Sequence, residues 1–231
     1  MEPTSVLNDP SKNAAQPRGF TLIEMLVVLA IIVIITAIVI TGQSAFNRTI
    51  ILTDTAYNIA FSAREAQSYG LSSRKFGSVQ NPGYGLHFDR VTPGSYTFFA
   101  DTAHNSATPW PSTCPLGTAG TPSQKPGDCR FTSSDGTVST YTFSRGYTIS
   151  KFCGKTGSRL YCSTDSSPLT SLDMVFTRPN TSTTISGPIN GSSVSTTFTC
   201  AQLTLTDQSK QATKTIRVSS LGEVSIGQTC P

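Results

Sequence analysis

The chain has 231 residues, of which 37% are hydrophobic and 13% are charged, and its formal net charge at pH 7 is +4. This length excludes more than one or two domains. The low charged fraction and the abundance of serine and threonine favour an exported surface that is rich in β-structure.

Residues 1–19 form a short polar leader, and residues 20–42 are expected to form one apolar helix. From Leu22 to Ile40 the only charged side chain is Glu24. A helix that rises about 1.5 Å per residue needs roughly 20 apolar residues to cross a bilayer, so this run is long enough. The apolar core of a conventional cleaved signal peptide is only about 7–15 residues long, so that reading is not favoured. Lys12 and Arg18 precede the span, which predicts a cytoplasmic N-terminus and an external C-terminal part.

Glu24 needs an explanation, because a carboxylate inside a membrane helix costs roughly 2.5–3.5 kcal/mol or more unless it finds a partner. In one interpretation Glu24 lies at headgroup depth and the span begins at Met25. In the other, the chain is cut between Gly19 and Phe20, and Glu24 then lies one helical turn from a new ammonium group on Phe20. The carboxylate would favour the positive helix N-terminus, or would pair with the amine of a neighbouring subunit and set axial register.

The sequence Gly19-Phe20-Thr21-Leu22-Ile23-Glu24 resembles the processing motif of bacterial type IV pilins and type II secretion pseudopilins. The resemblance implies cleavage after Gly19 by a prepilin peptidase and then N-methylation of Phe20. It implies that Glu24 docks on the N-terminus of another pilin or pseudopilin subunit. It also implies a single-pass protein of the inner (cytoplasmic) membrane that enters a pilus or pseudopilus, with its external domain in the periplasm or outside.

Residues 43–72 are expected to continue the helix as an amphipathic segment. We expect one helix from about Phe20 to about Gly70, because no proline interrupts the pattern before Pro82 and Gly70 is a plausible stop signal. The second half of this helix is predicted to pack an apolar stripe on the globular domain. The stripe consists of Phe46, Ile50, Tyr57, Ala60 and Phe61.

Residues 73–231 are expected to form an exported β-rich globular domain. From Phe76 onward the hydrophobic period changes to two, with glycine, proline and serine between the runs. A long helix followed by several such strands predicts an α+β fold, with the helix packed on antiparallel β-structure. The predicted strands are Tyr84–Phe88, Ser95–Ala100, Val138–Phe143, Tyr147–Phe152, Leu172–Phe176, Thr197–Thr206, Thr213–Val218 and Glu223–Ile226.

Several of these segments resemble successive strands of GspH/FimT-type minor pilins and pseudopilins. The resemblance implies a GspH-like β-fold and a low-abundance subunit near a filament tip. The insertion from about Asn105 to Arg130 is larger than this family leads us to expect. The segments that carry the likeness are Tyr84–Phe88, Tyr96–Asp101, Leu172–Phe176, Thr215–Val218 and Leu221–Val224.

An even number of cysteines in an exported domain predicts disulfides, and six cysteines allow fifteen pairings. Sequential pairing is the simplest arrangement, and it would join Cys114 to Cys129, Cys153 to Cys162 and Cys200 to Cys230. There is no Cys-x-x-Cys pair, and the two histidines, His87 and His104, are far from any metal-ligand spacing. We therefore expect neither a metal nor a cofactor.

The sequence contains no convincing catalytic constellation, such as a Gly-x-Ser-x-Gly elbow, a phosphate-binding loop of the P-loop type or a His-Glu-x-x-His helix. His87 is interpreted as an ordinary strand histidine. The chain is therefore not expected to be an enzyme, and no small-molecule substrate is predicted.

The alternative function is that of a DNA-binding or adhesive minor pilin. Basic residues that could neutralise phosphates are interleaved with aromatic residues that could stack on bases. The other interpretation of this stretch is a solvated basic loop. Some FimT-like minor pilins capture DNA through a Gly-Arg-x-Arg-like stretch, but Glu223 occupies the matching position after Gly222, which argues against that mode. The basic residues are Arg145, Lys151, Lys155 and Arg159.

Overall fold

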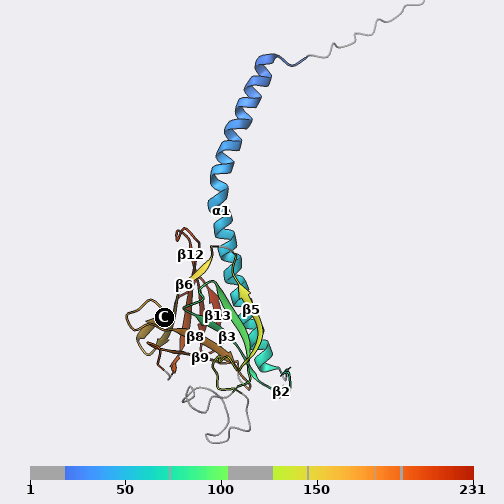
Figure 1. Ribbon diagram of the computed structural model, residues 1–231. Coiled ribbons are helices and arrows are strands. Elements are labelled where there is room, and N and C mark those ends of the chain that lie inside the picture. Colours follow the sequence, from blue (N-terminus) through green and yellow to red (C-terminus); the bar gives the residue numbers. More distant parts are fainter. Residues whose placement is uncertain (1–18, 73, 104–126, 145, 180, 193–194) are drawn as a thin grey trace, which may run out of the picture. The chain divides into compact units, whose positions relative to one another are not determined.

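The computed structural model describes residues 19–72, 74–103, 127–144, 146–179, 181–192 and 195–231. The chain divides into two compact units, Met1–Ala45 and Phe46–Pro231, which are described separately as the first and the second unit. Figure 1 labels the helix and the strands of these units. The expected α+β fold is confirmed, because a long N-terminal helix is followed by antiparallel sheets.

The first unit contains the beginning of helix α1 (Leu22–Leu71), which also supplies the first element of the second unit. Thr21 caps this helix, because its Oγ1 accepts a hydrogen bond of 3.3 Å from the backbone N–H of Glu24. A threonine followed three residues later by a glutamate is the capping-box pattern, which explains why the helix begins here. All side chains from Leu22 to Ile40 are exposed.

The second unit contains two large antiparallel sheets and a small hairpin of β1 (Lys75–Phe76) and β2 (Val79–Gln80). In the six-stranded sheet the order is β10 (Ser195–Phe198), β9 (Thr183–Pro188), β8 (Ser171–Phe176), β3 (Gly83–Asp89), β4 (Ser95–Asp101) and β5 (Gly136–Thr142). In the five-stranded sheet the order is β13 (Val224–Ile226), β12 (Thr213–Ser219), β11 (Cys200–Thr206), β6 (Thr148–Thr156) and β7 (Arg159–Cys162).

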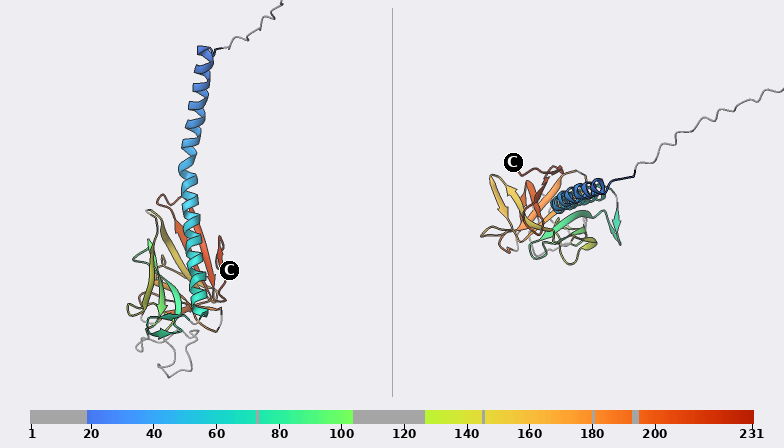
Figure 2. Two further views of the ribbon diagram at one scale, coloured as in Figure 1. Left: turned by 90° about the vertical axis from the view of Figure 1, so that its right-hand side faces the viewer. Right: turned by 90° about the horizontal axis from the view of Figure 1, so that it is seen from above.

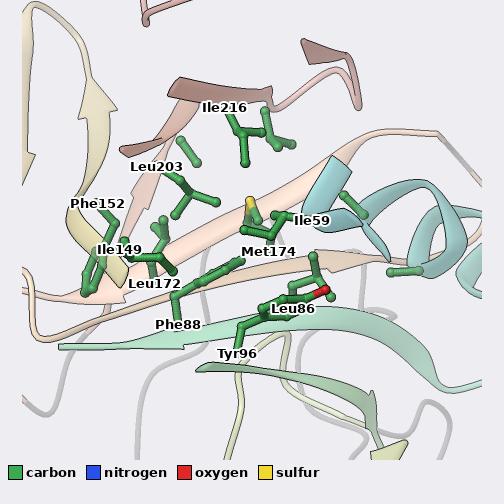
Figure 3. Close-up of a cluster of buried hydrophobic side chains, with 14 of the residues drawn as sticks. Ile59, Leu86, Phe88, Tyr96, Ile149, Phe152, Leu172, Met174, Leu203 and Ile216 are labelled. Atoms are coloured by element: carbon green, nitrogen blue, oxygen red, sulfur yellow. The ribbon is translucent and has the colours of Figure 1, made fainter. Parts of the chain in front are cut away.

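The core of the second unit lies where residues 46–71 of α1 meet both sheets (Figure 2). In Figure 3 the side chain of Ile59 from α1 lies among Leu86 and Met174 of the six-stranded sheet and Ile216 of the five-stranded sheet. The helical residues of this core are spaced by three and four positions, so they share one face of α1. They are Leu52, Ala56, Ile59, Ala63 and Ala66.

The predicted apolar stripe of α1 was wrong, because only its Ala60 is buried. The aromatic members are on the solvent side: Tyr57 is 61% exposed and Phe61 is 69% exposed, whereas Ile59 is 1% exposed. Both faces repeat at helical spacing, so periodicity alone cannot choose between them. The small alanines let the helix approach the two sheets closely, and large side chains of the sheets fill the core.

The predicted strand Thr197–Thr206 was also wrong, because it is two strands in different sheets. β10 pairs with β9 in the six-stranded sheet, and β11 pairs with β6 and β12 in the other. Thr199 lies between them, and its backbone N–H donates to the Lys155 carbonyl oxygen at 2.7 Å. The chain therefore changes sheets at Thr199. The strands β1, β2, β7 and β9 were not predicted.

A second, smaller core lies where residues 127–131 meet the six-stranded sheet, and it contains Phe99, Val175, Cys129 and Phe131. Asp101 anchors this segment, since its carboxylate accepts the backbone N–H groups of Asp128 and Cys129 at 3.0 and 2.8 Å. A Cβ on Gly127 would meet the Asp101 carboxyl group, so glycine is required there. Most of the expected insertion lies outside the described residues.

Candidate processing and assembly site

The predicted scissile bond between Gly19 and Phe20 lies directly before helix α1, in residues without regular structure. Phe20 is 77% exposed, and nothing lies within 4 Å of the position that a Cβ on Gly19 would take. A peptidase that acts on an extended segment would therefore reach this bond without unfolding any part of the helix.

Glu24 lies in the first turn of α1, and its side chain is exposed. A carboxylate is favourable there, because the first backbone N–H groups of a helix carry partial positive charge. Within the described part of the chain, the ion pairs are Arg48–Asp207, His87–Asp173 and Arg217–Glu223, so Glu24 is in none of them. Its charge is therefore available to a cation from another molecule.

The apolar run that follows is Leu22–Ile40, with a mean hydropathy of 3.2 and no buried residue. By length and composition this run is able to cross a membrane. An exposed apolar surface of this length needs either lipid or other apolar helices around it, because water would not solvate it favourably.

A family model described as the prokaryotic N-terminal methylation motif matches residues 16–40. The match includes Gly19, Phe20, Glu24 and the apolar run. The chain therefore carries the N-terminal motif of a type IV prepilin-like protein, and this motif indicates a structural subunit rather than an enzyme. No curated protein and no solved structure was found to match the chain.

Disulfide bonds join Cys153 to Cys162 and Cys200 to Cys230. The first links directly opposed residues of β6 and β7, and the second ties the C-terminal segment to β11. Cys129 is also disulfide-bonded, while Cys114, its expected partner, lies outside the described residues. Two of the three sequential pairs are thus present among the described residues.

The four residues of the predicted polyanion site do not all gather on one face. Lys151 and Lys155 are four residues apart on β6 and share a face, since alternate strand residues point the same way. Leu160 is opposite Lys155, so Arg159 points to the other face, where its guanidinium lies 4.5 Å from the Tyr161 ring centroid. Arg145 lies outside the described residues.

Glu223, which departs from the DNA-binding pattern, has a local partner in the structure. Its Oε2 lies 2.8 Å from Nη2 of Arg217, and Nη1 of Arg217 donates to Oε1 of Gln228 at 3.1 Å. Arg217 is therefore already engaged by the chain itself.

Two carboxyl groups that lie beside turn residues in the sequence, those of Asp101 and Asp135, are buried in the second unit. Burial raises the pKa of Asp101 well above its usual range, and the nearby Asp135 carboxylate raises it further. Asp135 accepts the backbone N–H groups of Thr102, Ala103 and Thr132, yet burial raises its pKa as well. These carboxyls serve as backbone anchors. No group of three potential metal ligands occurs among the described residues.

Proposed function

We propose that the protein is a minor pilin or pseudopilin, a structural subunit of a type IV pilus or of a type II secretion pseudopilus. The observation that carries the proposal is the methylation motif on an exposed Gly19–Phe20 junction, followed directly by an apolar helix without a partner inside the described chain. The GspH/FimT-type resemblance of the strands supports the minor subunit in particular.

Processing follows from the same junction. A prepilin peptidase of the inner membrane cuts after Gly19, the leader of residues 1–19 is lost, and the new N-terminal amine of Phe20 is methylated. Residues 20–42 then anchor the subunit in the membrane before assembly and pack in the filament core afterwards. Residues 43–72 connect this anchor to the external domain of residues 73–231.

Assembly would use the free carboxylate of Glu24. In the membrane an unpaired carboxylate is costly, so a neighbouring subunit that supplies its N-terminal ammonium at the right height is strongly preferred over one displaced along the axis. Glu24 in this way selects a single axial register between adjacent helices. The partners of the chain are then other pilin or pseudopilin subunits.

Intact-mass analysis tests the processing step. The protein is purified from membranes of a bacterium that has a prepilin peptidase, and in parallel from an otherwise identical strain without it. We expect a chain that begins at N-methylated Phe20 in the first strain and at Met1 in the second. A chain that begins at Met1 in both strains, or a cleavage near Phe46, would contradict the proposal.

DNA or surface binding by the external domain is not favoured as the main function. Only Lys151 and Lys155 of the four predicted basic residues share a face among the described residues, and Glu223 neutralises Arg217. A salt series separates the two readings, because phosphate contacts give an affinity for DNA that falls steeply with salt concentration. Binding that is lost on Lys151→Gln and Lys155→Gln substitution would restore the DNA-binding alternative.

A further inference from the structure

Strand β5 (Gly136–Thr142) forms one edge of the six-stranded sheet, and among the described strands it pairs with β4 alone. Just beyond it, the backbone N–H of Phe143 donates to the Gly94 carbonyl oxygen at 2.9 Å. Hydrogen-bonded and non-hydrogen-bonded positions alternate in an antiparallel pair, so the backbone groups of Thr140 and Thr142 point away from β4. Within the described residues no hydrogen bond reaches them.

The β5 edge lacks the features that usually protect an edge strand. Its sequence is Gly-Thr-Val-Ser-Thr-Tyr-Thr, with no charged residue and no proline. The other edges of the two sheets, β10, β13 and β7, have four, three and four residues, whereas β5 has seven. Natural sheets block long edges with charge, proline or short length, so β5 is open to pairing with a further strand.

A groove of about 400 Å³ runs between β5 and helix α1, within the second unit. Figure 1 shows β5 beside this part of the helix. Two contacts hold the floor of the groove together: Ser62 Oγ lies 2.9 Å from the phenolic oxygen of Tyr96, and the Tyr96 and Tyr141 rings stack with centroids 5.0 Å apart. Burial raises the pKa of Tyr96 to about 12, so this phenol stays neutral.

The helix side of this groove carries only negative charge. Asp54 and Glu65 line it, and neither forms an ion pair with a basic residue in the described part of the chain. Asp54 accepts a hydrogen bond of 3.2 Å from the amide of Asn58, which orients the carboxylate. Phe61, exposed on the same wall, supplies an apolar contact between the two acids.

We propose that the β5 edge and this groove bind an extended segment of a partner protein, which adds a strand to the six-stranded sheet. The backbone of the segment would pair with Thr140 and Thr142, and alternate side chains would enter the groove. Asp54 and Glu65 are about 16 Å apart along the helix axis, and residues four apart on a strand span about 13 Å. The segment therefore carries Lys or Arg at two inward positions four residues apart, with an apolar residue midway for Phe61.

The inference does not rest on the filament proposal, because it concerns only the second unit. The test uses the full chain in detergent micelles and the fluorescent seven-residue peptide Thr-Lys-Thr-Phe-Thr-Lys-Thr. Its lysines are at the second and sixth residues, and its phenylalanine is at the fourth. We expect saturable binding by fluorescence anisotropy, and no binding of the same peptide with glutamates in place of the lysines.

Two sets of variants separate strand pairing from charge. Thr142→Pro removes an outward N–H that the fold does not use, whereas Thr142→Ala keeps it. We expect the proline variant to lose binding and the alanine variant to retain it. The pair Asp54→Asn with Glu65→Gln should weaken binding by about tenfold or more, whereas Glu223→Gln, which removes one charge from the other sheet, should leave it unchanged.

Four results would overturn the proposal: no binding of the lysine peptide, equal binding of the glutamate peptide, unchanged affinity in the Asp54 and Glu65 double variant, or unchanged affinity in a folded Thr142→Pro variant. If Thr142→Pro does not fold, as judged by circular dichroism, the double variant and the glutamate peptide still decide whether the peptide binds at this groove.

Discussion

His87 Nδ1 lies 2.6 Å from Asp173 Oδ1, between neighbouring strands β3 and β8. The histidine ring also contacts Phe131, with ring centroids 4.4 Å apart, so the pair is covered by the segment that follows the insertion. Burial alone lowers the pKa of His87, but the Asp173 carboxylate, its hydrogen bond and Asp89 raise it, and the net pKa is above the ordinary value.

This pair predicts a pH dependence of stability. A histidine whose pKa is higher in the folded state stabilises the fold fully below its unfolded pKa, about 6.5, and loses that contribution as pH rises through the folded pKa. The free energy of unfolding of the wild-type protein should therefore fall above about pH 6.5 relative to His87→Gln, which does not titrate. Urea titrations of both proteins across pH 5 to 9 check this. The raised pKa of Asp101 also makes the free energy of unfolding depend on pH, but Asp101 is present in both proteins, so its effect cancels in the difference between their unfolding free energies. Parallel pH profiles would contradict the prediction.

The buried and the exposed face of α1 predict very unequal effects of two nearby substitutions on stability. Ile59→Ala leaves a cavity between the two sheets and should cost about 2–5 kcal/mol of unfolding free energy. Phe61→Ala is the matched control, because it removes a larger side chain from the exposed face and should change stability by no more than about 0.5 kcal/mol. Denaturant unfolding of the two variants measures both values. A larger cost for Phe61→Ala than for Ile59→Ala would mean that the sequence-based stripe, not the structure, gives the packed face.

Strands β3, β4 and β8 were predicted from the sequence because large apolar residues recur in them with a period of about two. Strand β9 was not, because its sequence, Thr-Thr-Ile-Ser-Gly-Pro, contains a single large apolar residue and so shows no alternation. At the change of sheet, Thr199 is hydrogen-bonded to Lys155, which is distant in sequence. Residues that come together only through the fold carry no local signal.

The same difference, between residues that are close in sequence and residues that only the fold brings together, explains why the processing motif was predicted and the groove beside β5 was not. The processing motif was predicted because Gly19, Phe20 and Glu24 lie within six consecutive residues, and the family match covers them. The groove beside β5 could not be predicted, since it joins Asp54 and Glu65 of the helix to Tyr141 of an edge strand. An edge strand is recognised only when its neighbours are known.

The two described disulfides should differ in their contribution to stability. In the chain-entropy model the bridge between Cys200 and Cys230, with a sequence separation of 30, contributes about 3.6 kcal/mol, and that between Cys153 and Cys162, with a separation of 9, about 2.6 kcal/mol. Replacing each pair by serine and measuring denaturant unfolding tests the order. A greater loss for the shorter loop would show that local contacts of β6 and β7, and not loop length, determine the effect.

Glu24→Gln should leave cleavage intact and reduce incorporation into filaments. Glutamine keeps the size of the side chain and can still take part in the capping box, so the helix start is preserved while the charge is lost. Loss of a charge-assisted pair in each subunit contact should lower incorporation at least about tenfold, which corresponds to about 1.4 kcal/mol.

Thr21→Ala is the matched control for Glu24→Gln, since it removes the N-cap hydrogen bond, worth about 1 kcal/mol, but retains the carboxylate. We expect this variant to assemble nearly as well as the wild-type protein. Intact mass reports cleavage in both variants, and the ratio of subunit in sheared filaments to subunit in membranes reports incorporation. If Thr21→Ala impairs incorporation and Glu24→Gln does not, the motif acts through the start of the helix, and the register role of Glu24 is wrong.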